Sequence, residues 1–370
     1  MTTPNFRMIR LARELRGLTQ TALATGAGMP QARVSRIETG QLDATPDDLG
    51  ALADVLELPP PFFTEPGAPA AAPLFRKRAI RSVRAITRIQ ARLNTAVLIA
   101  QRLVDAGIDL DPPQYFPEPG HFPPDEPGRA AAELRRDWRL PVGRVDNVVA
   151  VIEAAAGIVL RADFGTSDAT AAFITTLQDG RMWFLVNTRE TAGDRVRLSL
   201  AHELGHAVLH RMLPSHEESL TELEAFTFAA ALLLPPDHFD HAVPYDALTL
   251  AHARRLKRTF GVSIQAVIRA AHDRGRISRH RYSSLFKQLS ARQWRTNEPD
   301  PLPLEQPRVW PAVLRVHREE HRYTDNDLAE IARVTTSQLA DLFPEHFTAR
   351  PVLRAVRAAP RAPAPADAPS

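Results

Sequence analysis

The stretch Leu198–His210 reads LSLAHELGHAVLH and contains His-Glu-Leu-Gly-His at positions 202–206. On a helix, residues four positions apart lie on one face, so His202 and His206 can present two imidazoles to a single metal ion. Glu203 follows the first histidine, where it is placed to take a proton from water at the metal. The stretch therefore predicts a buried helix that carries a metal-dependent hydrolytic site.

An open zinc site needs a third protein ligand, and two nearby candidates fit poorly. Position 212 is a methionine, where the metzincin pattern requires a histidine. His210 lies one helical turn beyond His206, but three imidazoles in a row would not converge, so we expect His210 to pack beside the site. The chain contains no cysteine, which excludes cysteine-ligated zinc and disulfides.

The segment 222–235, ELEAFTFAAALLLP, is the better source of that ligand. In a helix, Glu222 shares a face with Ala225 and Ala229, whose small side chains would let this helix approach the histidine helix closely. Glu224 lies on a different side of the same helix. We therefore predict Glu222 as the third ligand and keep Glu224 as the alternative.

The sequence around this motif predicts helices and a few strands. Periodicity and turn residues indicate a helix at 144–156, strands at 158–162, 171–177 and 182–187, and helical segments over 197–289 and 310–347. We expect strand 182–187 to offer a free edge along which an extended peptide adds as a further strand.

Residues 13–40 read RELRGLTQTALATGAGMPQARVSRIETG and predict two short helices joined by a glycine turn. Thr19 is a suitable N-cap for the first helix, Gly26–Gly28 turn the chain, and Gly40 ends the second helix. In a helix-turn-helix unit, the second helix lies in the major groove with its N-terminal side chains at the base edges. The segment thus predicts DNA binding.

This stretch resembles the XRE family of helix-turn-helix regulators over nearly all of residues 6–60. The resemblance is carried by Arg-Gly-Leu-Thr-Gln at 16–20, Val-Ser at 34–35, Ile-Glu at 37–38 and Gly40. It implies a double-stranded DNA operator as partner, with these residues in contact: Gln31, Ala32 and Arg36 at base edges, and Gln20 and Arg33 near the DNA backbone. These residue types suit the task, since glutamine can bond adenine and arginine can bond guanine.

The metal-site stretch is similar to the ImmA/IrrE family of zinc peptidases over roughly residues 74–300. The similarity is carried by His-Glu-Leu-Gly-His at 202–206, Glu-x-Glu-Ala-x-x-Phe-Ala from 222 and Leu-Leu-x-Pro ending at 235. It implies a zinc cofactor bound by His202, His206 and Glu222, with Glu203 as the catalytic base. It also implies a protein substrate, such as a repressor or the chain itself.

These patterns divide the chain into a helix-turn-helix domain at 1–63, a linker at 64–73, a peptidase-like domain at 74–300 with a metal-site core of about 128–275, a small helical region at 301–357 and a disordered tail at 358–370. The predicted fold class is mainly α with a small β-sheet: an N-terminal helix-turn-helix bundle, a central α+β zincin-like domain and a C-terminal helical region. For 301–357, a second helix-turn-helix stays open beside a plain packing module, because its two helical runs lack a glycine turn.

The 370 residues carry 46 basic and 43 acidic side chains, and a net charge of +3 does not by itself indicate a nucleic-acid binder. No apolar run approaches the roughly 20 residues of a membrane span, and the N-terminus lacks an export signal. We therefore expect a cytoplasmic protein with no membrane partner.

Together these observations predict a DNA-binding transcriptional regulator that carries a zinc-dependent endopeptidase, with a homodimer among the states open to it. The alternative is a regulator or antitoxin-like repressor whose zinc domain senses a ligand or partner without proteolysis. The intact Glu203 favours the enzyme, since a purely structural zinc site does not need a base.

Overall fold

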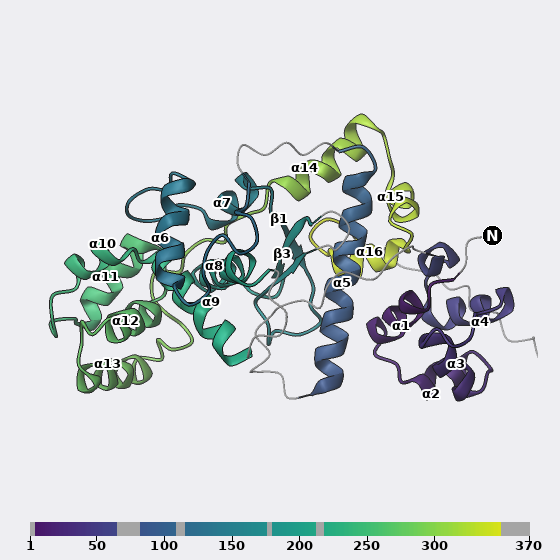
Figure 1. The fold of residues 1–370 in the computed structure, drawn as a ribbon, viewed down its shortest axis with the longest axis horizontal. Helices are drawn as coiled ribbons and strands as arrows, with labels where there is room; N and C mark the ends of the chain where they lie inside the picture. Colours follow the sequence, from purple (N-terminus) through teal and green to yellow (C-terminus); the bar gives the residue numbers. More distant parts are fainter. Residues whose placement is uncertain (1–3, 65–81, 109–114, 176–179, 212–217, 349–370) are drawn as a thin grey trace, which may run out of the picture.

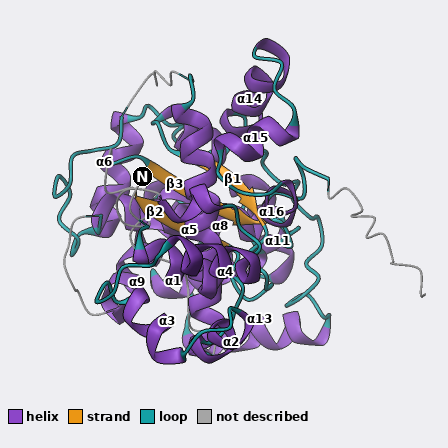
Figure 2. Ribbon diagram, turned by 90° about the vertical axis from the view of Figure 1, so that its right-hand side faces the viewer, coloured by secondary structure: helices purple, strands orange, loops and turns teal. Residues whose placement is uncertain are grey.

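The computed structural model describes residues 4–64, 82–108, 115–175, 180–211 and 218–348. These residues form helices around one small sheet, which confirms the predicted fold class (Figure 1, Figure 2). The predicted linker, from residue 65 on, and the predicted tail at 358–370 lie outside the described residues.

A bundle of short helices begins the chain: α1 (Phe6–Leu15), α2 (Gln20–Gly26), α3 (Gln31–Glu38), α4 (Pro46–Leu56) and η1 (Pro60–Thr64). Thr19 caps α2 as predicted, because its side chain accepts a hydrogen bond from the amide of Ala22. Gly28, in the turn between α2 and α3, has a left-handed φ of 65°, which glycine adopts without strain. These local signals fix the helix-turn-helix arrangement.

Three strands form the sheet at the centre of the molecule: β1 (Ile158–Ala162), β2 (Ala171–Thr175) and β3 (Met182–Asn187), in the order β1-β3-β2. β3 runs antiparallel to β2, so the predicted hairpin is present, with residues 176–177 of its first strand outside the described part. β3 also pairs in parallel with β1. The prediction that 182–187 is a free edge strand is therefore wrong, because both of its edges are hydrogen-bonded to neighbouring strands.

Side chains of the sheet alternate between two apolar cores, as the two-residue period of a strand requires. On one face, residues such as Leu160 and Trp183 belong to a core that also holds α5 (Val83–Asp105) and the C-terminal helices. On the other face, Phe173 and Phe184 belong to a core with α8 (Gly193–Leu209) and α9 (Glu218–Leu233). The sheet thus separates the predicted metal site from the N-terminal bundle.

The second core is completed by six further helices: α6 (Pro127–Asp137), α7 (Val148–Ala154), α10 (Pro236–Ala242), α11 (Leu250–Phe260), α12 (Ile264–Asp273) and α13 (Arg279–Ala291). The predicted helix at 144–156 begins later, at Val148, because the Asn147 side chain accepts a hydrogen bond from the amide of Ala150 and caps α7 there.

Helix α5 lies between the sheet and the N-terminal bundle (Figure 1). Met8 of α1 and Leu93 of α5 are fully buried in the same apolar core, and Arg84 of α5 donates a hydrogen bond to the carbonyl of Gly17. The sequence predicted two folding units separated by a linker, whereas here one continuous core joins them. α5 is long but too polar for a bilayer, and no other described helix is both long and apolar enough to cross one.

Four short helical segments follow near the C-terminus: α14 (Val309–Arg315), the π-helical turn η3 (Val316–Glu320), α15 (Asp325–Ile331) and α16 (Thr336–Leu342). They cover α5 and one side of the sheet, where Leu328 and Leu339 are completely buried. The buried guanidinium of Arg161 on β1 forms an ion pair with Glu345 just beyond α16. This packing fits the interpretation of residues 301–357 as a plain helical packing module. The alternative, that the region is a second helix-turn-helix unit, stays a prediction.

The extended segment 297–308 connects these C-terminal helices to the metal-site domain. Its Glu298 carboxylate accepts a hydrogen bond from the amide of Ile264 at the start of α12, at 2.7 Å. Its Glu305 carboxylate accepts one from the amide of Val148 at the start of α7, also at 2.7 Å. Two helix N-termini, which carry unsatisfied N–H groups and partial positive charge, are thus capped from a distant part of the chain.

Candidate metal centre and DNA-reading face

Helices α8 and α9 pack against each other with their backbones unusually close at one point. A Cβ added to Gly205 of α8 would lie 3.0 Å from the carbonyl oxygen of Ala225 and 3.1 Å from its Cα. Any larger residue at position 205 would press on the backbone of α9, so glycine suits this close approach. The sequence predicted the small residues on α9; the matching role of Gly205 was missed, although it stands inside the His-Glu-Leu-Gly-His motif.

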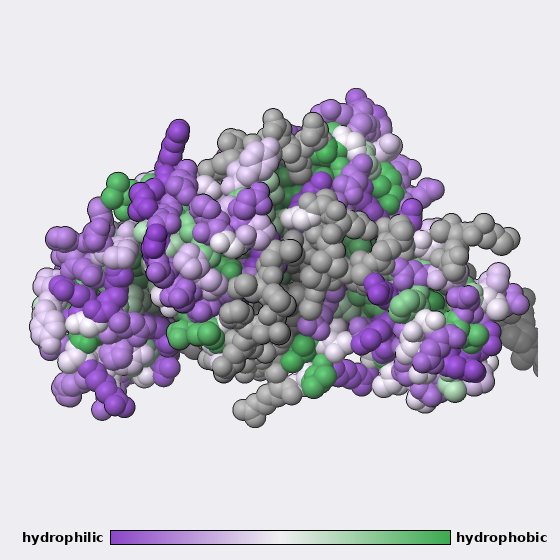
Figure 3. Space-filling model, viewed as in Figure 1, coloured by the Kyte–Doolittle hydropathy of each residue, from purple (hydrophilic) through white to green (hydrophobic). Residues whose placement is uncertain are grey.

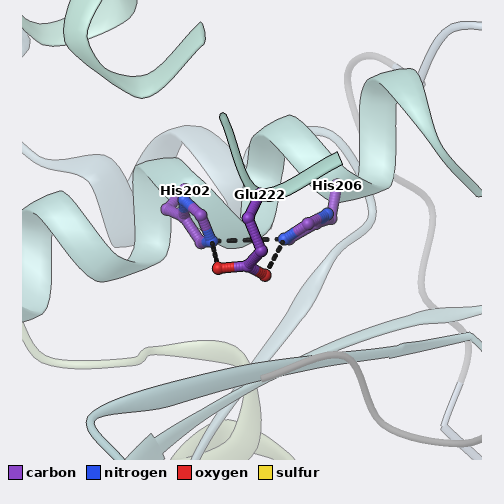
Figure 4. Close-up of side chains that lie close together, drawn as sticks. All are labelled: His202, His206 and Glu222. Atoms are coloured by element: carbon purple, nitrogen blue, oxygen red, sulfur yellow. Dashed lines mark hydrogen bonds and ion pairs between the residues drawn. The ribbon is translucent and has the colours of Figure 1, made fainter. Parts of the chain in front are cut away.

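This close packing brings together the three predicted metal ligands (Figure 4). The Nε2 atoms of His202 and His206 lie 3.2 Å apart. The Glu222 carboxylate reaches both rings, at 3.6 Å from Nε2 of His202 and 3.3 Å from Nε2 of His206. Both histidines are buried, while the Glu222 side chain keeps 18% exposure.

These separations match the donor set of a zinc ion. Ligands at about 2.0–2.1 Å from a tetrahedral zinc lie about 3.3–3.4 Å from one another. Burial lowers the pKa of His206, against the opposing effect of Glu222, and so favours the neutral imidazole that binds metals. The Glu222 pKa is held below its usual range: burial would raise it, but hydrogen bonds and charge interactions with His202 and His206 outweigh that effect.

Glu203 lies beside these ligands but is not one of the converging group. It is 2% exposed, and one of its carboxylate oxygens has no hydrogen-bond partner among the described residues. Burial raises the pKa of Glu203 well above its usual range, the Glu222 charge raises it further, and a hydrogen bond from the backbone N–H of Phe173 opposes both. The carboxylate thus has an unsatisfied acceptor beside the proposed ligands.

His210 and Glu224 form a second group behind His206. Nδ1 of His206 faces Nδ1 of His210 at 3.1 Å, on the side of the ring away from His202. Nε2 of His210 lies 2.8 Å from the Glu224 carboxylate, and both side chains are buried. His210 therefore lies beside the site, as predicted from its position, whereas Glu224 was considered from the sequence only as the alternative metal ligand.

Phe173 belongs to β2, which is an edge strand in the described part of the sheet. Its side chain packs in the core with α8, and its backbone N–H points toward Glu203. The sheet edge near the candidate metal centre is therefore β2. It is the antiparallel neighbour of β3, the strand that was expected from the sequence at this edge.

The predicted base-reading residues Gln31, Ala32 and Arg36 are exposed on α3. The face of the bundle seen in Figure 3 is mostly hydrophilic. Gln31 donates a hydrogen bond to the side chain of Gln20 at 3.0 Å, and Gln20 donates in turn to buried Glu38 at 2.9 Å. Two of the predicted contact residues are therefore preorganised against each other.

Arg33 makes a different set of contacts from the other predicted DNA-binding residues. Its guanidinium forms two hydrogen bonds to the Asp48 carboxylate, at 2.8 and 2.6 Å, and Asp48 also caps α4. This interaction holds the Asp48 pKa below its usual range. Arg33 thus connects α3 to α4. A DNA phosphate that contacts Arg33 would have to share its guanidinium with Asp48.

Comparison with known families supports both the N-terminal bundle and the domain that holds the candidate metal centre. Residues 9–63 match a helix-turn-helix family model, and residues 154–272 match the model of a peptidase family described as the IrrE N-terminal-like domain. No curated protein matches the chain. Fold and matches define a class of protein, a DNA-binding regulator with a metallopeptidase-type domain. More particularly, the chain is a fusion of an XRE-type helix-turn-helix unit with an IrrE/ImmA-like domain.

Proposed function

We propose that this protein is a transcriptional regulator whose zinc-dependent endopeptidase domain cleaves a protein, either a repressor or the chain itself. The observation that carries the proposal is the convergence of His202, His206 and Glu222 at 3.2–3.6 Å beside Glu203, one of whose carboxylate oxygens has no hydrogen-bond partner among the described residues. The donor set of two imidazoles and one carboxylate is typical of catalytic zinc sites that keep an open position.

Each residue has a separate task in this proposal. His202, His206 and Glu222 hold zinc, which when bound polarises a scissile carbonyl and lowers the pKa of water toward about 7. Glu203 accepts the proton of the attacking water through its free carboxylate oxygen and passes it to the leaving amine. Burial of the histidines excludes bulk water, which strengthens these electrostatic interactions.

The first test combines metal analysis with a cleavage assay. We expect the purified chain to hold about one zinc per monomer, because the three ligands fit one tetrahedral site. Incubation with proteins encoded beside its gene, and with the chain alone, should yield a discrete cleavage product that a chelator abolishes. A zinc-free protein after metal loading would refute the metal site.

A sensor without proteolysis is the second candidate, and the burial of the site favours it. Glu203 is 2% exposed and accepts a hydrogen bond from the backbone N–H of Phe173, so a substrate has little access to its carboxylate. Stoichiometric zinc together with no cleavage of any tested protein would support the sensor over the enzyme.

For the DNA-binding domain, we propose that Arg36 reads a guanine in a double-stranded operator. Arg36 is exposed on α3, and among the described residues its side chain makes one long hydrogen bond, to the carbonyl of Ala32 at 3.4 Å, so its guanidinium is available to a base. Arg36→Ala should weaken specific binding by about 1–3 kcal/mol and leave binding to random DNA nearly unchanged. Fluorescence anisotropy with both DNAs at one salt concentration measures this, and equal losses on the two would exclude base reading.

A further inference from the structure

We propose that Glu224 and His210 form a positioning relay that orients the metal-binding ring of His206. This inference rests on the zinc site of the proposed function. The side chains form one continuous line through the buried space between α8 and α9: Glu224 to His210 at 2.8 Å, and His210 to His206 at 3.1 Å.

Glu224 determines which nitrogen of His210 carries the proton. An ionised carboxylate only accepts hydrogen bonds, so the Nε2 of His210 that faces it must donate. In a neutral imidazole the other nitrogen then has a lone pair. Nδ1 of His210 therefore presents an acceptor to His206.

His206 is oriented by that acceptor. Its Nδ1 lies against Nδ1 of His210 and donates to it, which leaves the lone pair on Nε2. That Nε2 is the atom next to His202 and Glu222. The relay thus selects the tautomer and the ring orientation that a zinc ligand needs, which is the general role of groups behind metal-binding histidines.

The same geometry excludes His210 as a fourth protein ligand. His210 contacts the Nδ1 side of the His206 ring, whereas the converging donors lie on its Nε2 side. The two motif histidines also differ: His202 has a buried Nδ1 with no hydrogen-bond partner among the described residues. His206 is therefore the ring that the protein fixes in advance.

The test is a double-mutant cycle read out as zinc affinity, by competition with a chromophoric chelator. Glu224→Leu, which removes the hydrogen-bond acceptor, and His210→Phe should each weaken zinc binding by about 10–100-fold. The double variant should have the same zinc affinity as the single variant with the lower affinity, because either change alone already interrupts the relay. His210→Asn, which puts an amide near the position of Nδ1, should recover part of the loss seen with His210→Phe.

Controls separate the relay from general damage. Thr227→Val removes a hydroxyl that donates to the carbonyl of Leu223 on the same helix, and it should leave zinc affinity unchanged. Glu224→Leu has a side chain of similar size with no acceptor, so it decides the matter even if His210→Phe does not fold. The visible spectrum of the cobalt-substituted protein should change with Glu224→Leu but not with Thr227→Val.

The outcomes distinguish the relay from the site on which it rests. A wild-type chain that binds no zinc overturns both the site and the relay. A wild-type chain with one zinc, and folded variants of unchanged affinity, overturns the relay alone. If the two fold-losses in zinc affinity multiply in the double variant, the relay is also contradicted, since Glu224 and His210 would then act independently.

Discussion

Replacing Glu203 by glutamine is expected to slow cleavage by about 10²–10⁴-fold, the usual contribution of a general base. Zinc content should stay at the wild-type level, because His202, His206 and Glu222 are the converging donors and Glu203 is not among them. The amide has the shape of the carboxylate and can still accept the hydrogen bond from Phe173. Only proton transfer should be lost.

The measurement is the appearance of cleavage product under single-turnover conditions, with elemental analysis of the same sample. Operator affinity of the variant provides a control, since the proposed base-reading residue Arg36 lies on α3, beyond the sheet and α5 (Figure 1). Cleavage at the wild-type rate by a zinc-loaded Glu203→Gln variant would show that another group acts as base.

Replacing Glu222 by alanine is expected to abolish stoichiometric zinc binding. The change leaves two imidazoles of a three-ligand set, so the loss should exceed the roughly 10–100-fold effect of changing a group behind a ligand. Glu224→Gln is the matched control on the same helix: at saturating zinc it should still hold one ion. Elemental analysis after dialysis measures both, and the reverse pattern would assign the third ligand to Glu224.

The sequence predicted the features of the site that depend on local periodicity. His202 and His206 are four residues apart on one helix, and Glu222 was selected by the face it shares with Ala225, so neither inference required the tertiary structure. The pairing of Glu224 with His210 was not predictable, because it depends on how α8 and α9 cross. That crossing is set by the contact of Gly205 with Ala225.

Strand order was the clearest failure of sequence reasoning. The hairpin of β2 and β3 is local and was predicted, but β1 adds to the outer edge of β3 through a pairing that no turn signal encodes. The same limit applies to the N-terminal bundle. Caps and glycines predicted its helices, whereas the pairing of Arg33 with Asp48 and the contact of Arg84 with Gly17 join distant segments.

The core that α1 shares with α5 and the sheet has a thermodynamic consequence for the whole chain. Segments that share one core tend to unfold as a cooperative unit. An operator that binds only the folded bundle would then stabilise the sheet and α5 as well, by about 2.7 kcal/mol when its free concentration is about a hundred times its dissociation constant. In that case DNA would act as a folding ligand for the sheet and α5 that support the proposed zinc site, and release from DNA would lower the free energy needed to unfold them.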